Sequence, residues 1–317
     1  MINKKEKIIV ILGATATGKT GLAVYLANKY NGEIISADSR QVYKGMDIGT
    51  GKDLKDYKLK FKNKQGKVKT KNISYHLMDV VSPKTEFNLA KYCRLAEKAI
   101  WDIIKRGKLP IIVGGSGLYL QALVDGYDLS SVKAQPELRE KLEKLSAQEI
   151  FFKLKQEDKK FADNLNNSEK NNKRHLIRYY ENIVNKNLGK LNLFQNENRE
   201  FLILGLSRSK EDIDKRIYKR LIERIEKEKM IEEVKNLHKK GVSWKRLEAF
   251  GLEYRFVSFY LRAKMSLDEM QEKLFIAIRQ FAKRQMTWFR RWEKQGRKIY
   301  WISKKQEADK LIKDFLK

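Results

Sequence analysis

The chain has few of the residues that build disulfide-stabilised or zinc-binding proteins. Among its 317 residues there are 1 Cys, 3 His and 3 Pro. A single cysteine, Cys93, cannot form a disulfide within the chain, and His76, His175 and His238 are too few and too far apart for a four-ligand zinc site or an HExxH metalloprotease. We therefore interpret the three histidines as structural or surface residues.

Long apolar segments are also missing. The run Ile8 to Leu12 is too short for the core of a signal peptide, and no run approaches the roughly 18 residues that a membrane-spanning helix needs. We expect a cytoplasmic protein without membrane association.

Positive charge, by contrast, is abundant. The chain has 69 Lys and Arg against 40 Asp and Glu, a formal net charge of +29, while 42% of its residues are hydrophobic and 10% aromatic. This composition supports a sizeable core. An excess of one sign repels itself unless an anionic partner compensates it, so the composition favours a polyanion such as RNA as a partner.

The first half of the chain alternates between apolar runs and helical patterns. Strands are expected at Ile8–Leu12, Glu33–Ala37, Ile111–Val113 and Phe201–Leu206, and helices at about 19–30 and 89–106. Apolar strands separated by helices predict a parallel sheet covered on both faces, in an α/β fold. Ligands of such sheets bind at the carboxyl ends of the strands.

A different pattern occupies residues 130–195. Apolar strands are absent there, Pro136 fits the first position of a helix, and Ser146 with Glu149 forms a capping box. We expect a small all-helical insertion domain over 130–195, within a catalytic core made of 1–129 and 196–317.

Residues 52–72 contain nine lysines. Two stretches with period-two alternation flank a Gly-containing turn, which fits an exposed hairpin or a solvated loop. Further along, Ser209 is expected to cap one long helix that carries apolar residues from Ile213 to Leu237, and Ser266 to cap a final helix that reaches about Lys294.

One motif matches a known chemical function in full. Residues 13–20, GATATGKT, fit G-x-x-x-x-G-K-[ST] and lie between an expected strand and an expected helix, which is the context of a phosphate-binding loop. Backbone N–H groups and the helix N-terminus would bind phosphate oxygens. Lys19 adds a charge, and the Thr20 hydroxyl is a candidate Mg²⁺ ligand. The motif does not distinguish a diphosphate from a triphosphate ligand.

Asp38 follows the second expected strand and would therefore lie near this loop. Its carboxylate could take a proton from a nucleophile, or it could cap a helix; the spacing fits both roles equally well. The segment Gly114–Gly117, which contains Ser116, ends the third strand at the same edge, where small residues let a substrate approach the backbone.

Two arginines, Arg216 and Arg220, are four residues apart on one expected helix and can point the same way. They suit a pyrophosphate leaving group, or they pair with Glu223 and the other charges of that helix. The final helix mixes basic and aromatic residues, which fits either an RNA-binding face or core packing with a solvated basic face.

Taken in order, these segments resemble the tRNA dimethylallyltransferases, also called tRNA isopentenyl transferases. The resemblance rests on segments of residues 13–20, 36–50, 76–83, 113–120, 216–217 and 282–290. It is closest to the bacterial type, since the C-terminal zinc finger of eukaryotic members is absent.

The resemblance implies a P-loop NTPase-like parallel sheet flanked by helices, with the helical insertion closing over RNA. The implied reaction transfers a dimethylallyl group from dimethylallyl diphosphate to N6 of adenine 37 in tRNA, with Mg²⁺, in a monomeric cytoplasmic enzyme. Asp38 would be the general base, and Thr20 and Arg216 would complete the catalytic set.

The family likeness also assigns binding residues. The diphosphate would bind Gly13, Ala14, Thr15, Ala16, Thr17, Gly18, Lys19 and Thr20, with Thr20 as the metal ligand. Contacts to tRNA would come from Asp38, Ser39, Arg40, Gln41, Ser116, Arg174, His175 and Arg178.

The sequence departs from the family pattern in several places. Gly51-Lys-Asp53 replaces Ala-Lys-Pro, Phe250-Gly-Leu-Glu-Tyr254 replaces a Gly-Tyr segment, and the lysine-rich segment 52–72 is an extra element. His175 stands where an arginine is usual, and Ser116 where a threonine is usual.

Three other functions share part of this pattern. A P-loop nucleoside or nucleotide kinase would use the same loop and Mg²⁺ but leaves the charge of +29 unexplained. An adenylate (AMP) isopentenyltransferase shares almost every core residue, and only the insertion and the basic surface separate it from a tRNA enzyme. A non-catalytic RNA-binding module would not need Lys19, Thr20 and Asp38.

Overall fold

The computed structural model describes residues 5–62, 68–126, 135–184 and 198–317. The chain forms two compact units, one made of Met1–Val124 with Asn196–Lys317 and the other of Asp125–Gln195. The expected domain boundaries at 129/130 and 195/196 lie outside the described residues. Each unit is described separately below.

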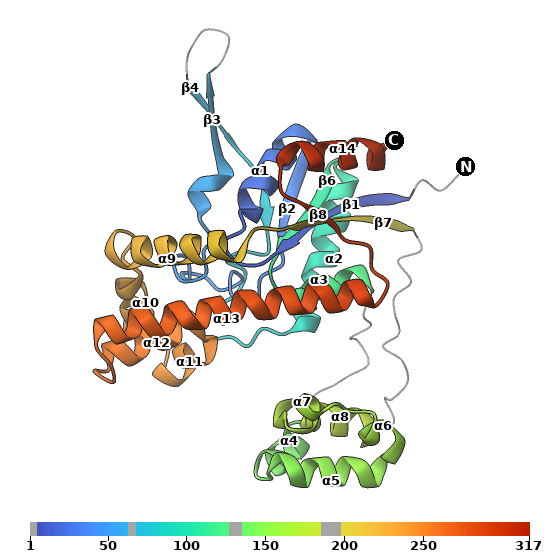
Figure 1. Ribbon diagram of the computed structural model, residues 1–317, viewed down its shortest axis with the longest axis vertical. Coiled ribbons are helices and arrows are strands. Elements are labelled where there is room, and N and C mark those ends of the chain that lie inside the picture. Colours follow the sequence, from blue (N-terminus) through green and yellow to red (C-terminus); the bar gives the residue numbers. More distant parts are fainter. Residues whose placement is uncertain (1–4, 63–67, 127–134, 185–197) are drawn as a thin grey trace. The chain divides into compact units, whose positions relative to one another are not determined.

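The first unit is built on a six-stranded parallel sheet in the order β5-β2-β6-β1-β7-β8 (Figure 1). The strands are β1 (Glu6–Gly13), β2 (Gly32–Ser36), β5 (Tyr75–His76), β6 (Leu109–Gly114), β7 (Arg199–Leu206) and β8 (Tyr300–Ile302). The four expected strands are confirmed. The short edge strands β5 and β8 were not anticipated, because two or three residues carry no readable periodicity.

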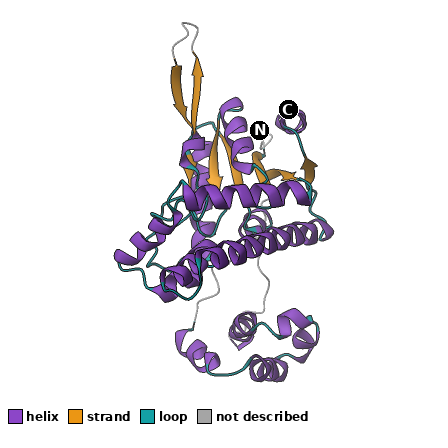
Figure 2. Cartoon of the chain, turned by 60° about the vertical axis from the view of Figure 1, so that its left-hand side comes forward, coloured by secondary structure: helices purple, strands orange, loops and turns teal. Residues whose placement is uncertain are grey.

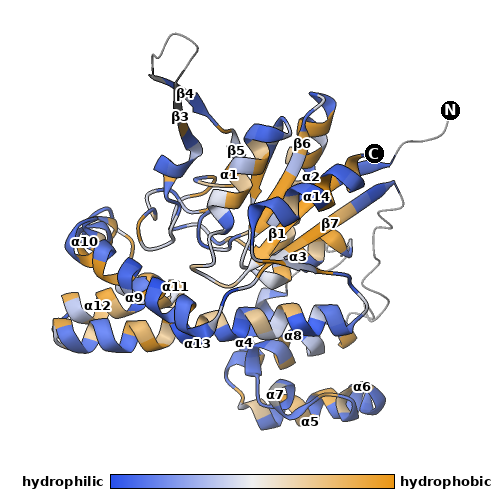
Figure 3. Ribbon diagram, turned by 45° about the horizontal axis from the view of Figure 1, so that its top comes forward, coloured by the Kyte–Doolittle hydropathy of each residue, from blue (hydrophilic) through white to orange (hydrophobic). Residues whose placement is uncertain are grey.

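Both faces of the sheet are covered by helices. One face packs against α1 (Lys19–Lys29) and α14 (Lys305–Leu316). The other packs against α2 (Leu89–Lys105), α3 (Gly117–Val124) and the C-terminal part of α13 (Leu267–Lys294). The central strands are apolar on both sides, as Figure 3 shows, because each face is buried.

A helical layer surrounds the carboxyl-end side of the sheet. It consists of α9 (Lys210–Glu226), α10 (Met230–Lys239), α11 (Trp244–Phe250), α12 (Leu252–Leu261) and the first half of α13. The prediction of one helix through Ile213 and Leu237 is wrong. Lys229 adopts a left-handed conformation, φ 64°, which interrupts the helical hydrogen-bond ladder and separates α9 from α10.

The lysine-rich segment forms a hairpin. After the 3₁₀ turn Leu54–Tyr57, β3 (Lys58–Lys62) pairs antiparallel with β4 (Val68–Asn72), and Figure 2 shows the pair standing out from the unit. At its base the buried Ile73 donates its backbone N–H to Tyr57 O at 2.8 Å. The hairpin alternative is confirmed for these strands; the expected turn lies outside the described residues.

The described residues of the second unit are helical. They form α4 (Pro136–Glu143), α5 (Ala147–Glu157), α6 (Lys159–Asp163), α7 (Asn167–Lys170) and α8 (Lys173–Val184). Pro136 begins α4, and the Ser146–Glu149 capping box begins α5, as expected. A small apolar core that includes Ile150, Leu154 and Leu176 holds the helices together. In neither unit is any described helix long and apolar enough to cross a membrane.

A buried carboxylate joins the sheet to its flanking helices. The Glu33 side chain on β2, only 3% exposed, forms ion pairs with Arg106 and Lys108 and a hydrogen bond with the His76 ring. His76 lies 2.7 Å from it and Lys108 2.6 Å. Hydrogen bonds from Arg106, followed by those from Lys108 and His76, hold the pKa of Glu33 well below its usual range, against the effect of burial.

Replacing Glu33 should weaken the fold. Because hydrogen bonds to charged groups contribute about 2 kcal/mol, we expect Glu33→Gln to lower the free energy of unfolding by about 2 kcal/mol near neutral pH. Since the folded-state pKa lies below the unfolded one, this stability is present above the unfolded pKa and is lost as pH falls toward the folded value. Urea unfolding of both proteins at pH 7 and pH 3 should show the difference shrinking in acid.

Asp102→Asn is the matched control, since Asp102 pairs with the same Arg106 at the exposed surface. We expect it to change stability by no more than about 0.5 kcal/mol. Equal losses in the two variants would contradict the role of the buried carboxylate.

Candidate active site

The phosphate loop, residues 13–20, connects β1 to α1 as the motif predicts. Gly13 lies so close to β7 that a Cβ atom there would be 2.9 Å from Leu206 O. Gly18 precedes α1 with φ 95°, a conformation that favours glycine. The two motif glycines are thus required by crowding at one position and by backbone conformation at the other.

Side chains from distant segments hold the loop. Gln285 of α13 accepts from Thr15 N at 2.8 Å and donates to Gly115 O at 2.9 Å, so it links the loop to the segment after β6. Lys19 Nζ donates to Ala14 O at 2.7 Å. Gln285 was not singled out from the sequence, although it lies in one of the segments that carry the family resemblance.

Arginines from α9 and its approach contact the same loop. Arg216 Nε donates to Ala16 O at 2.8 Å, and Arg220 Nη2 donates to Thr15 Oγ1 at 2.6 Å. Arg208 Nε donates to Thr17 O at 2.9 Å. Among the described residues neither Arg216 nor Arg220 pairs with Glu223. In the structure both arginines therefore pair with the phosphate loop, and their binding of a pyrophosphate leaving group stays a prediction.

Burial and mutual repulsion lower the pKa values of two cations at this loop. Burial, followed by the charge of Arg220, lowers the pKa of Lys19 to about 8, although Asp38 opposes the shift. Burial and the charge of Arg224 lower the pKa of Arg220 to about 10. Desolvated cations that repel one another are a good environment for an anionic ligand, because the anion restores the lost solvation.

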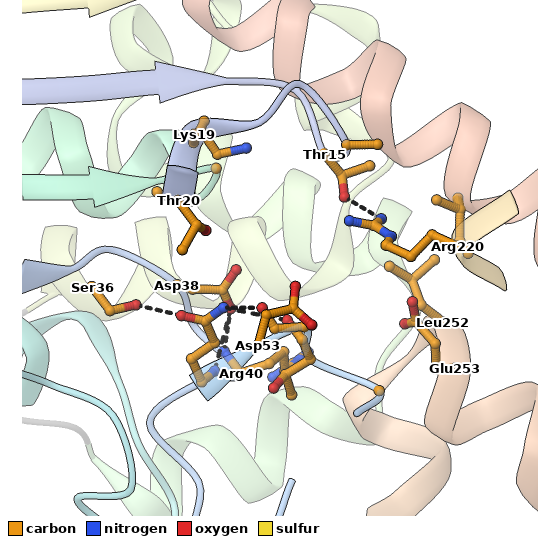
Figure 4. A pocket seen from close by; sticks show the side chains of 18 of the residues that line it. Thr15, Lys19, Thr20, Ser36, Asp38, Arg40, Asp53, Arg220, Leu252 and Glu253 are labelled. Atoms are coloured by element: carbon orange, nitrogen blue, oxygen red, sulfur yellow. Dashed lines mark hydrogen bonds between the residues drawn. The ribbon is translucent and has the colours of Figure 1, made fainter. Parts of the chain in front are cut away.

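Asp38 lies at the carboxyl end of β2 and faces the same space (Figure 4). Its Oδ1 accepts from Arg40 N at 2.8 Å and from Gln41 N at 3.4 Å, so one oxygen caps the turn that follows. No described residue donates a hydrogen bond to Oδ2. The helix-cap alternative is wrong, because a turn and no helix follows Asp38. One oxygen caps this turn, and the role of the carboxylate as a base stays a prediction.

The neighbouring residues proposed to contact a base gather at this edge. Ser39 N donates to Ser116 Oγ at 3.2 Å, across 77 positions in sequence. Gln41 accepts from Ser36 Oγ at 2.7 Å and donates from Nε2 to Gly51 O at 3.1 Å. The Arg40 guanidinium lies over the Phe250 ring, 5.6 Å from its centroid.

A cavity of about 660 Å³ joins these parts (Figure 4). Its walls come from the phosphate loop, residues 38–41 and 49–57, the β6–α3 turn, α9, the start of α12 and α13. Lys19, Thr20, Asp38 and Arg216 all line it, so the structure brings the expected phosphate-binding and acid–base residues together.

Three expected RNA-binding residues belong to the second unit. Arg174 and His175 are exposed on α8, where the His175 ring lies beside Tyr179. Arg178 is half-buried and donates to Glu181 Oε2 at 3.3 Å. These residues remain candidates within their own unit.

Other charged residues of the site were not identified from the sequence. Arg208, Arg224, Asp53 and Glu253 all lie at the loop or in the cavity. Arg224 continues the four-residue spacing of Arg216 and Arg220, so the helical period could have indicated it.

The fold and the site define an α/β protein with a phosphate-loop motif beside a carboxylate. Comparison with known proteins specifies the family. The family model for IPP transferase matches residues 41–292, and that for isopentenyl transferase matches residues 6–73. The chain therefore belongs to the IPP transferase family.

Curated relatives and solved structures agree with this. The chain is 44% identical over 307 residues to tRNA dimethylallyltransferase 2 of Treponema denticola, covering 96% of this chain and 98% of that one. It resembles the tRNA isopentenylpyrophosphate transferase of Bacillus halodurans with TM-score 0.69 and 32% identity, over 98% of this chain and 97% of the other. A eukaryotic dimethylallyltransferase acting on tRNA also matches, with TM-score 0.69 and 28% identity, over 89% and 69% of the two chains.

The low pKa of Lys19 gives a test of the anion site. The protonated amine binds anions better, so raising the pH from 7 to 9, through a pKa of about 8, should weaken the binding of inorganic diphosphate. Since about nine-tenths of a group with that pKa is neutral at pH 9, we expect up to about a tenfold rise in Kd. Isothermal titration calorimetry measures this.

Lys19→Met should bind diphosphate weakly and lose this part of the pH dependence. Lys29→Met is the control on the same helix, because Lys29 pairs with Asp309 instead of lining the cavity. If the wild type and Lys19→Met show the same pH slope, Lys19 is not the titrating group.

Proposed function

We propose that the chain transfers a dimethylallyl group from dimethylallyl diphosphate to N6 of adenine 37 in tRNA, as a cytoplasmic monomer. The observation that carries the proposal is the shared cavity: Lys19 of the phosphate loop, Asp38 and the arginines of α9 line one space. The names of the curated relatives support the same reaction.

In this reaction the diphosphate of the donor occupies the phosphate loop. Backbone N–H groups at the start of α1, together with Lys19 and the guanidinium groups of Arg216 and Arg220, stabilise the negative charge that grows as the C1–O bond of the donor breaks. These groups act on the leaving group. Because adenine N6 is a weak nucleophile, the reaction needs the departure of diphosphate to be made easier.

Asp38 acts on the acceptor. The N6 lone pair forms the new bond to C1 of the dimethylallyl group, diphosphate leaves with the electrons of the C1–O bond, and the proton of N6 passes to Asp38 Oδ2. Because Oδ1 is held by the backbone N–H groups of Arg40 and Gln41, the carboxylate has a defined orientation toward the cavity.

The residues present fit a magnesium ion. The Thr20 hydroxyl makes no hydrogen bond to any described residue. Oxygen ligands from one or two side chains plus substrate phosphates are the usual magnesium environment. When bound there, Mg²⁺ would offset the charge of the departing diphosphate.

The charge of the chain favours RNA as the acceptor. The net charge of +29 attracts a polyanion over a distance, with an affinity that falls as salt rises. Adenine 37 must leave its stack to reach a cavity, which costs a few kcal/mol and less in a single-stranded loop.

The choice of acceptor is the first prediction of this proposal. With labelled dimethylallyl diphosphate and Mg²⁺, we expect label in unmodified tRNA that bears adenine 37, none in AMP, and no ATP turnover without RNA. Incorporation into AMP but not tRNA would identify an adenylate isopentenyltransferase, and RNA-independent ATP turnover would identify a kinase.

The second prediction concerns Asp38. We expect Asp38→Ala to lower kcat by about 10² to 10⁴, the usual range for loss of a general base, with tRNA affinity nearly unchanged. Asp38→Asn keeps a side-chain oxygen that can cap the turn, but the amide cannot act as a base. We therefore expect its kcat to fall by a similar factor. A normal rate in Asp38→Asn would exclude Asp38 as the base and leave it the capping role.

A further inference from the structure

Arg224 lies on α9 one helical turn beyond Arg220 and lines the same cavity. It is 4% exposed, and its Nε and Nη2 atoms have no hydrogen-bond partner among the described residues. Guanidinium donors buried without partners are costly, so a role beyond packing is expected for this side chain.

Two carboxylates flank the Arg224 guanidinium. Nη2 lies 3.8 Å from Asp53 Oδ2, and Nη1 lies 3.9 Å from Glu253 Oε1. These distances are longer than hydrogen bonds, so the three groups are held by charge attraction. Burial raises the pKa of Glu253, and the charge of Arg224 is the largest effect opposing that rise.

The two acids lie in residues 51–53 and 250–254. These segments are about two hundred residues apart, and both contact Arg224; beside them, Gly49 packs against the Tyr254 ring. Gly51 belongs to the same arrangement. It has φ 66°, and a Cβ atom there would lie 2.5 Å from Arg224 Nη2, so the guanidinium occupies the space of a side chain.

The turn around Gly51 leads to the residues expected to contact the base. Gly51 O accepts from Gln41 Nε2 at 3.1 Å, and Gln41 follows the turn capped by Asp38. On the other side, α9 presents Arg220 to Thr15 of the phosphate loop. Arg224 therefore lies between the anion-binding and the base-binding walls of the cavity.

We propose that Arg224 is a positioning residue of the transfer reaction, an inference that rests on the proposed function. Its charge holds Asp53 and Glu253 on either side of it and so fixes residues 51–53 and the start of α12 against α9. Glu233 separately holds the backbone of residues 47–49 and the Tyr254 hydroxyl. Without the charge of Arg224 the two carboxylates have no cation between them and the turn at residues 51–53 moves. Gln41 and Arg220 then lose their relative placement, and with it the alignment of acceptor and donor.

The first experiment compares Arg224→Met with Arg224→Lys in tRNA prenylation. A misplacement of about 1 Å can cost about 10²-fold in rate, so we expect kcat of Arg224→Met to fall about 10- to 100-fold, with a smaller change in KM for the donor. Arg224→Lys keeps the charge between the two acids and should recover most of kcat. Lys215→Met, which removes an exposed charge from the same helix outside the cavity, should behave as wild type.

The second experiment uses Gly51. Its single variant keeps the Arg224 guanidinium, so it can be measured even if Arg224→Met does not fold. Gly51→Ala should lower kcat more than Gly45→Ala does when Arg224 is present. In Arg224→Ala, where the space is free, only the effect of the left-handed backbone should remain. Gly45→Ala is the control: Gly45 has φ 71°, but a Cβ atom there would be no closer than 3.9 Å to its nearest neighbour, Leu237.

The outcomes separate the two proposals. A wild-type protein that does not prenylate tRNA would contradict the proposed function. An active wild type in which Arg224→Met keeps its kcat, or in which the effects of Gly51→Ala and Arg224→Ala on kcat are simply multiplicative, would overturn the positioning role of Arg224.

Discussion

The structure depends on one electrostatic constraint: several cations must be kept close together, partly out of water, at the carboxyl ends of a parallel sheet. Lys19 and Arg220 show the cost in their lowered pKa values. The cost is tolerated because the loop backbone is held from outside, by Gln285 and by the arginines. Anion binding stabilises a group of cations arranged in this way. The site therefore suits a leaving group whose negative charge grows during the reaction.

The same edge must also hold acidic groups without neutralising these cations. Asp38 keeps one oxygen on the backbone N–H groups of the following turn, so its carboxylate is directed without an ion pair. Asp53 and Glu253 are placed instead around Arg224, a turn of α9 farther along than Arg220. The cavity thus separates charges that would otherwise pair, and the separation leaves both the cations and the Asp38 carboxylate facing the cavity.

Much of the site could be predicted because it is encoded locally. The phosphate loop is a contiguous motif between a strand and a helix, and Asp38 and Ser116 directly follow strands whose carboxyl ends meet at one edge. The missed residues have no local signal. Gln285 acts 270 positions away from Thr15, and the break at Lys229 depends on one backbone conformation inside an otherwise helical pattern.

From its sequence alone the chain reveals an α/β fold, a phosphate loop, a charge suited to RNA and a family resemblance, because composition, period and contiguous motifs are properties of neighbouring residues. Only the tertiary structure decides which side chains share the cavity. It selects the phosphate loop over Glu223 as the partner of the α9 arginines, and it brings Gly51, Asp53 and Glu253 together around Arg224. Such contacts depend on how distant segments pack, and no pattern along the chain records the distance between them.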